Sequence, residues 1–274
     1  MNKELTIDEY KEIILENLKN FDKFCRKNNI KYSLYGGTQL GSIRHGGFIP
    51  WDDDIDVVLM PEEYEKFIKL YKNEGIYKII SYESNKDYYH PFIKIIDTRL
   101  YAYEDNTKPI DELGPYIDIF RFNYIPNNKI KRKFYLLKYI IMLKIIIGLS
   151  KNEPEKGVIR KLRTKISKRI NANQFIRKFD LFLRKYNKRP TDEMICNYMS
   201  LSIKNNIQKV YNFKNVNDVK FEDMIAMNAN GTDAMLKVNF GDYMQLPPKE
   251  KQVGHHYIHA YWKDDLKKKG KQRW

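Results

Sequence analysis

Four aspartates lie within five residues of one another, directly before an apolar, β-branched run. Asp52, Asp53, Asp54 and Asp56 lead into residues 57–60. Side chains along a strand alternate between faces, so Asp54 and Asp56 point the same way, about 7 Å apart. Two carboxylates on one face repel each other unless a cation lies between them. Because hard oxygen ligands suit Mg²⁺ or Mn²⁺ better than zinc, the cluster predicts a metal site rather than a polar turn before a strand.

A glycine pair precedes this cluster. Gly36 and Gly37 end a predicted strand and precede a short helix, where backbone N–H groups can receive phosphate oxygens. Alone, such a pair is more typical of a tight turn. Together with the aspartate strand and a third acid on a neighbouring strand, it predicts a phosphate-binding metal site. We choose Asp118 as the third acid, since a buried strand aspartate without a partner is costly. The alternative, Asp97, stands at the end of its strand, where an aspartate is more often a cap.

The elements that must position these side chains alternate between helical and extended patterns. Thr6 and Glu9 form a capping box that opens a helix, and apolar residues keep helical spacing as far as Phe24. Further predicted elements are a strand over 30–34, a short helix over 38–44, the aspartate strand, a helix over 62–72, strands over 77–82, 91–97 and 116–122, and an imperfect helix over 221–243. The tail 266–274 is expected to be a solvated Lys/Arg run.

The composition indicates a folded protein with one good core and a smaller second one. Of 274 residues, 42% are hydrophobic and 14% aromatic, which excludes a disordered chain. Cys25 and Cys196 give no disulfide framework, and the first residues lack the apolar core of a signal peptide. The most apolar stretch, 134–149, is broken by two lysines and falls short of the roughly 20 residues of a membrane span. We therefore expect a cytoplasmic protein without a transmembrane helix.

Positive charge is concentrated in one segment. Residues 129–189 hold 20 Lys and Arg against 3 Asp and Glu, whereas the rest of the chain holds 30 against 32. The split predicts a near-neutral catalytic core over 1–128, a basic helical segment over 129–220, and a C-terminal helical region over 221–274 that completes the core or the site.

Three interpretations of the basic segment remain open. It forms a helical hairpin on an anionic membrane, where it reaches a lipid-linked glycan; it binds an acidic acceptor polymer; or it is a solvated helical face. Its apolar residues between 134 and 147 favour the first, with the protein peripheral at the inner face of the cytoplasmic membrane.

The stretch from Gly36 to Val57 resembles the signature of the LicD family. The similarity continues over 92–97, 116–120 and 240–248 and covers most of the chain outside the basic segment. LicD proteins resemble nucleotidyltransferase-fold enzymes that transfer phosphocholine from CDP-choline to sugars of cell-surface glycans, and relatives transfer other phospho-alcohols. The resemblance implies an α/β (α+β) fold with a nucleotidyltransferase-type mixed sheet, flanking helices and a C-terminal helical part.

The resemblance also implies the reaction. A phospho-alcohol passes from a CDP-activated donor to a sugar hydroxyl of a teichoic acid, a lipopolysaccharide or a lipid-linked precursor, and CMP is released. Asp54 and Asp56 would bind two Mg²⁺ or Mn²⁺ ions, with Asp118 as third ligand and base. The residues expected at the donor phosphates and nucleotide are Gly36, Gly37, Thr38, Arg44, His45 and Lys94. Further candidates beside the site are Trp51, Asp53, His255 and His256.

Some of these residues have a plain structural alternative. Arg44 could pair with an acid, Lys94 could lie on a solvated strand face, and Trp51 could be a core aromatic. His255 and His256 share with His259 a spacing that invites a zinc site, but no fourth ligand is evident and the cysteines are distant.

Two further features bear on ligand binding: the residues that follow the third acid and the aromatic residues that could surround a choline group. The family commonly has a proline and an aspartate after the strand of the third acid, whereas this chain has Arg121-Phe122-Asn123. A choline donor needs an aromatic cage for its quaternary ammonium. Many tyrosines are available, and five cluster in one stretch of the sequence: Tyr82, Tyr88, Tyr89, Tyr101 and Tyr103.

Two competing functions use the same features. A nucleotidyltransferase would attack an NTP at its α-phosphorus and release pyrophosphate with the same aspartates. A nucleic-acid-binding protein would use the basic segment. Against the second, the aromatic stacking patterns of known binding modules are absent and the charge is confined to one region.

Overall fold

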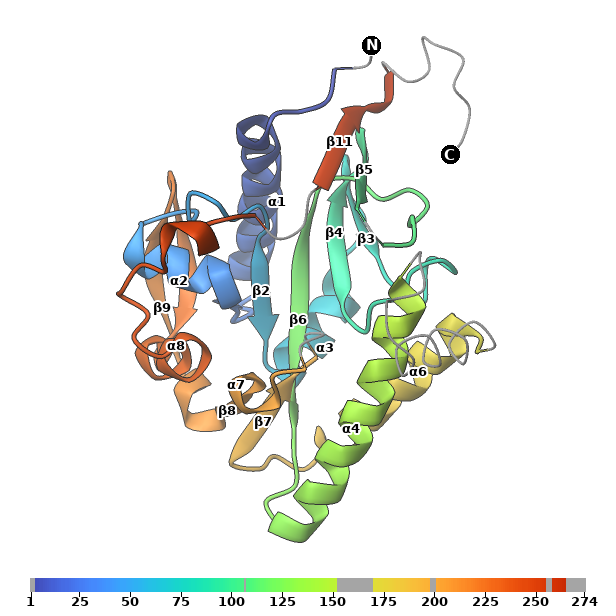
Figure 1. The fold of residues 1–274 in the computed structure, drawn as a ribbon, viewed down its shortest axis with the longest axis vertical. Coiled ribbons are helices and arrows are strands. Elements are labelled where there is room, and N and C mark those ends of the chain that lie inside the picture. Colours follow the sequence, from blue (N-terminus) through green and yellow to red (C-terminus); the bar gives the residue numbers. More distant parts are fainter. Residues whose placement is uncertain (1–2, 106, 152–169, 198–200, 255–257, 265–274) are drawn as a thin grey trace.

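A seven-stranded mixed sheet forms the centre of the molecule (Figure 1). The computed structural model describes residues 3–105, 107–151, 170–197, 201–254 and 258–264. The main strands lie in the order β1-β2-β6-β4-β3, and β7 and then β8 extend the sheet from β6. The strands are β1 (Ser33–Leu34), β2 (Asp56–Leu59), β3 (Tyr77–Ile80), β4 (Ile93–Asp97), β6 (Tyr116–Tyr124), β7 (Glu193–Cys196) and β8 (Ile207–Lys209).

The pairing of β2 with β6 is parallel, and the other pairs of this sheet are antiparallel. The long strand β6 pairs with β2 and β4 along its first half and with β7 along its end. Helices and a mixed sheet together confirm the predicted α+β class.

Two helices cover one face of the sheet. They are α1 (Ile7–Lys27) and α3 (Pro61–Leu70), and they share one buried core with the alternate strand residues Val57, Ile95 and Ile119. The capping box that predicted the start of α1 is present: Thr6 Oγ1 accepts a hydrogen bond from the Glu9 N–H, and the Glu9 carboxylate accepts one from the Thr6 N–H. Alternation places the neighbouring residues of β2, β4 and β6 on the opposite face.

Two helices of the basic segment pack against part of that opposite face. They are α4 (Lys129–Ser150) and α6 (Ala172–Leu183), whose Tyr139 and Phe179 share a buried cluster with Ile96 and Tyr116 of the sheet. The helical prediction is thus confirmed for these two stretches, although the segment also supplies β7 and β8. The basic residues between 152 and 169 lie outside the described part of the chain.

The C-terminal part contains strands as well as a helix. β9 (Val216–Phe221) and β10 (Met224–Ala229) form a hairpin, so the predicted helix over 221–243 is wrong for its first half, and α8 covers only Thr232–Phe240. The cause is tertiary: the Ala229 N–H donates to Ser33 Oγ at 3.0 Å, which holds β10 beside β1. Contacts of this kind override local propensity.

The remaining elements are short. A second two-stranded ladder joins β5 (Leu100–Glu104) to β11 (Ile258–Trp262) at the upper end of the molecule (Figure 1). Next to it Glu4 contacts His259 and accepts a hydrogen bond from the Tyr261 hydroxyl. The other helices are α2 (Gly36–Arg44), α7 (Ile203–Asn206) and the 3-10 turns η1 (Arg184–Tyr186), η2 (Val210–Phe213) and η3 (Lys249–Lys251).

Two further expectations concern the cysteines and membrane-spanning helices. Cys25 and Cys196 are both buried and carry free thiols, as predicted. Within the described ranges, the helices are too short or too polar to cross a membrane.

Candidate active site at the aspartate cluster

A cavity of about 920 Å³ lies beside the start of β2, a size that suits a small-molecule ligand. Its lining includes Asp52, Asp54 and Asp56, which are alternate residues of the segment that leads into β2. Asp54 and Asp56 therefore share one side of the chain, as predicted. The regular strand begins only at Asp56, so Asp54 precedes β2 instead of belonging to it.

A row of three buried charged residues crosses the sheet at this point. Asp56 lies opposite Asp118 in the parallel β2–β6 pair, and Asp118 lies opposite Lys94 in the antiparallel β6–β4 pair. The Lys94 ammonium is 2.7 Å from Asp118 Oδ1 and 3.4 Å from the centre of the Tyr116 ring. Lys94 is 2% exposed, so its alternative as a solvated strand residue is wrong.

The carboxylates disfavour one another's ionisation. Burial raises the pKa of Asp56 well above its ordinary value, and the charges of Asp54, Asp118 and Asp52 raise it further. Burial also raises the pKa of Asp118, to about 6, although the neighbouring Lys94 opposes the change. A cation bound among these groups would relieve their repulsion.

The glycine pair allows α2 to approach the acids closely. A Cβ atom on Gly37 would lie 2.2 Å from Asp52 Oδ2, and one on Gly36 would lie 3.0 Å from Asp56 Oδ2. Gly36 also has a φ of +56°, which favours glycine. Both glycines lie in the first turn of α2, two residues earlier than the predicted start, and no side chain caps that turn. The positive end of the helix dipole thus lies beside the carboxylates.

Thr38 positions Asp56 through a hydrogen bond to its backbone. Its hydroxyl accepts a hydrogen bond from the Asp56 N–H at 2.9 Å, and its side chain is buried. Thr38 is not among the residues that line the cavity. Its role in this geometry is therefore to fix the start of β2.

The far wall of the cavity comes from the C-terminal part of the chain. Residues 239–248 contribute most of it, and the basic residues of the described lining are Arg44 and Lys251. Arg44 Nη1 donates to the carbonyl oxygen of Tyr243 at 2.9 Å, so this guanidinium binds backbone instead of an acid. Lys251 was missed from the sequence, where only its position shortly after Pro247-Pro248 in the LicD-like stretch could have pointed to it.

Several predicted site residues lie outside the cavity lining. His45 packs its ring edge against Trp51, which does line the cavity, and burial followed by the charge of Arg44 lowers the pKa of His45. Asp53 is buried and does not line the cavity. Lys94 and Asp118 lie behind Asp56 in the sheet.

Of the histidine cluster, the described part of the chain includes His259. His255 and His256 lie outside the described residues. His259 contacts Glu4 through Nδ1 and Asp105 through Nε2, and its ring stacks on Tyr103. This histidine therefore helps to join β11 to its surroundings.

Asp97, the rival third acid, has the capping role that its position suggested. Its carboxylate accepts a hydrogen bond from the Arg99 N–H at 2.9 Å and forms an ion pair with the Arg99 guanidinium. Neither Asp97 nor Asp118 lines the cavity, but Asp118 is the register partner of Asp56 in the sheet. This register favours Asp118 as the third acid.

The aromatic residues of the cavity differ from those predicted. None of the five tyrosines proposed for a cage lines it; Tyr82, for example, donates to Asp180 instead. The aromatic side chains that do line it are Tyr35, Trp51, Phe240 and Tyr243. They come from three separate stretches of the chain, so sequence clustering alone could not identify them.

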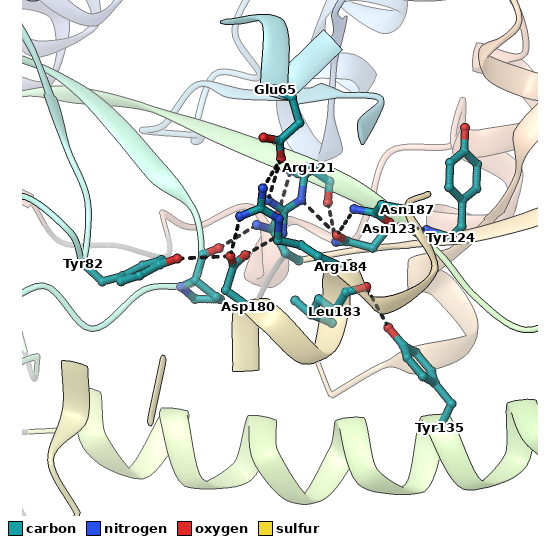
Figure 2. Close-up of polar contacts among 12 residues, drawn as sticks. Glu65, Tyr82, Arg121, Asn123, Tyr124, Tyr135, Asp180, Leu183, Arg184 and Asn187 are labelled. Carbon is teal, nitrogen blue, oxygen red and sulfur yellow. Dashed lines mark hydrogen bonds and ion pairs between the residues drawn. The ribbon is translucent and has the colours of Figure 1, made fainter. Parts of the chain in front are cut away.

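Arg121 and Asn123, which lie where the family commonly has a proline and an aspartate, take part in a buried polar network (Figure 2). Arg121 is 2.5 Å from Asp180 of α6, and its Nε donates to Asn123 Oδ1 at 2.9 Å. Asp180 also accepts hydrogen bonds from the Tyr82 hydroxyl and from Arg184. Because Arg121 and Asn123 do not line the cavity, they tie β6 to α6 instead of contacting a ligand there.

The cavity residues fit a metal ion that arrives with a phosphate ligand. Among the described residues, no three His, Cys, Asp or Glu side chains are placed to hold an ion by themselves. Mg²⁺, however, is usually bound by one or two carboxylates together with substrate phosphates and water. Asp54 and Asp56 offer that pair, and the acids of the lining outnumber its two basic side chains.

Comparisons with known proteins identify the family of the chain. The family model described as "LicD/FKTN/FKRP, nucleotidyltransferase domain" matches residues 29–141. The chain is 31% identical over 281 residues to the lipopolysaccharide cholinephosphotransferase LicD of Haemophilus influenzae, with 94% of this chain and 99% of that protein covered. A shorter match, 39% identical over 77 residues, joins 27% of this chain to 25% of an uncharacterized protein of Rickettsia typhi. On this near full-length similarity, the chain belongs to the LicD family.

Proposed function

We propose that this protein transfers phosphocholine, or a related phospho-alcohol, from a CDP-activated donor to a hydroxyl of a glycan and releases CMP. The observation that carries the proposal is the cavity in which Asp54 and Asp56 meet the uncapped N-terminus of α2. The Haemophilus relative, named a lipopolysaccharide cholinephosphotransferase, supports the transferred group and the glycan acceptor.

The lining offers a chemical group for each part of such a donor. The N–H groups of the first turn of α2 and the side chains of Arg44 and Lys251 would bind phosphate oxygens. Trp51 and Tyr243 offer ring faces for a quaternary ammonium. Both signs of charge and an aromatic surface thus lie around one space.

Asp54 and Asp56 would hold Mg²⁺ or Mn²⁺, with Asp118 next to them. Such an ion, when bound, screens the diphosphate charge and lowers the pKa of an attacking hydroxyl. Asp118 is our proposed base, because it lies opposite Asp56 in the sheet and burial raises its pKa toward the neutral range. Lys94 keeps the Asp118 carboxylate oriented through its 2.7 Å contact.

The donor test separates phospho-alcohol transfer from nucleotidyl transfer. The protein is incubated with CDP-choline, CDP-ethanolamine, CDP-ribitol or CTP and a glycan acceptor, and mass spectrometry identifies the products. We expect CMP from a CDP-alcohol, a phospho-alcohol on the acceptor, and no product with EDTA. Pyrophosphate from CTP with a cytidylyl group on the product would show nucleotidyl transfer instead, the reaction that the name of the matched family model suggests.

A matched pair of glycine variants tests the close approach of α2 to the acids. Gly36 and Gly75 have φ angles of +56° and +58°, so replacing either with alanine costs about 1–2 kcal/mol of stability. Only at Gly36 does the new Cβ press on Asp56. We expect both variants to melt at a similarly lowered temperature and only Gly36→Ala to lose CMP release. Equal activity of the two would show that the contact with Asp56 is not needed.

A further inference from the structure

Helix α4 presents an apolar stripe to solvent along its outer side. The stripe consists of Ile130, Phe134, Leu137 and Ile141, which are 69%, 67%, 54% and 53% exposed. Their spacing of four, three and four residues places them on one side of the helix. The opposite side is the buried one and carries Tyr135, Tyr139, Leu143 and Ile146.

Exposed lysines border the stripe on both flanks. At 100° per residue, Lys133 and Lys144 lie along one flank, and Lys131 and Lys138 lie along the other. The whole helix contains six Lys and Arg residues and no acid. Large apolar side chains between two rows of lysine are the pattern of a helix that lies in a lipid interface.

The helix is held in place by its buried side. Tyr135 stacks on Phe182 with ring centres 4.6 Å apart, and Tyr139 packs on Phe179 at 5.6 Å. Asn128 caps its first turn through hydrogen bonds from the N–H groups of Ile130 and Lys131. The outer side is therefore preorganised, and no ordering of the helix opposes its binding to a partner.

We propose that this outer side of α4 binds the surface of an anionic phospholipid bilayer. The apolar stripe enters the interface, and the bordering lysines contact lipid phosphates. Charge complementarity selects this partner: a second copy of α4 would bring lysines against lysines. α4 lies along the lower right of the molecule (Figure 1). None of its residues lines the cavity. The proposal thus adds a membrane surface to the proposed chemistry without depending on it.

The test uses flotation of the full chain with lipid vesicles. We expect binding to vesicles that contain phosphatidylglycerol, weaker binding to pure phosphatidylcholine, and a decrease as salt rises. Replacing both Phe134 and Leu137 with glutamine should lower the partition coefficient on the order of tenfold per side chain. The matched control replaces Ile7 and Ile225, each 51% exposed on other elements, and should bind as the parent does.

A second variant tests the charged flanks independently. Replacing the four lysines that border the stripe with glutamine should weaken binding about fivefold per lysine at low salt. Circular dichroism and thermal melting verify that each variant is folded. CMP release measured with a small soluble acceptor should be the same in these variants as in the parent, so loss of vesicle binding is separable from loss of chemistry.

Three results would overturn the proposal. The first is that the parent chain fails to float with anionic vesicles at low salt, and the second is that the Phe134 and Leu137 variant floats as well as the parent. The third is that this variant abolishes a concentration-dependent dimer while the parent shows no vesicle binding. The last result would assign the stripe to a second copy of the chain.

Discussion

Asp56→Asn is expected to abolish turnover while leaving the protein folded. Asp56 lies between Asp54 and Asp118 and lines the cavity, so its loss removes a ligand that the proposed metal ion needs. Even groups that only support metal ligands cost 10–100-fold when replaced, so we expect CMP release to fall by more than about 100-fold. Because the pKa of Asp56 is raised in the fold, its ionised form destabilises the metal-free protein at neutral pH. The variant should therefore melt at the same or a higher temperature without metal.

Asp97→Asn is the matched control. Asp97 is buried, as Asp56 is, but it binds Arg99 in a turn, so its replacement should leave CMP release close to normal. Near-native activity of Asp56→Asn at saturating donor and Mg²⁺ would end the metal interpretation. If Asp97→Asn were inactive and Asp118→Asn active, the third acid would be misassigned.

Asp180→Ala should cause the largest loss of stability. Asp180 is the acid closest to the guanidinium of Arg121, and both side chains are at most 5% exposed (Figure 2). Removing it leaves Arg121 buried with its nearest counter-charge gone, which costs about 3–5 kcal/mol of unfolding free energy. Urea denaturation followed by circular dichroism measures the change.

Two comparisons make this result specific to the buried network. Lys237→Ala breaks an exposed pair with Asp233, and it should change stability far less. The double variant Arg121→Met with Asp180→Leu removes both charges and should recover most of the lost stability. A single Asp180→Ala variant as stable as the parent would show that the network does not hold α6 to β6.

Local patterns were enough to predict the part of the fold that carries the acids. The capping box at Thr6 and the apolar spacing define α1, because both signals lie within the helix itself. β4 and β6 are likewise rich in β-branched and aromatic residues. The shared side of Asp54 and Asp56 followed from a period of two, which any extended chain obeys, whereas Asp52 and Asp242 of the lining were not predicted as ligands.

Features that depend on distant contacts could not be predicted in the same way. Residues 224–229 have a helix-compatible composition, yet they form a strand because Ser33 and Tyr32 bond to their backbone. The pairing of Lys94 with Asp118 could not be predicted, because the two residues are 24 positions apart in sequence. The far wall of the cavity over 239–248 required the complete tertiary fold.

The ladder of β5 and β11 exposes the chain to aggregation during its synthesis. β5 emerges from the ribosome early, whereas its partner, β11, lies near the end of the sequence. Until β11 is synthesised, the edge of β5 lacks the strand that pairs with it, and such unpaired edges readily pair with other chains. A ribosome that stalls before Ile258 would therefore release an aggregation-prone protein in which the acidic cluster is already synthesised.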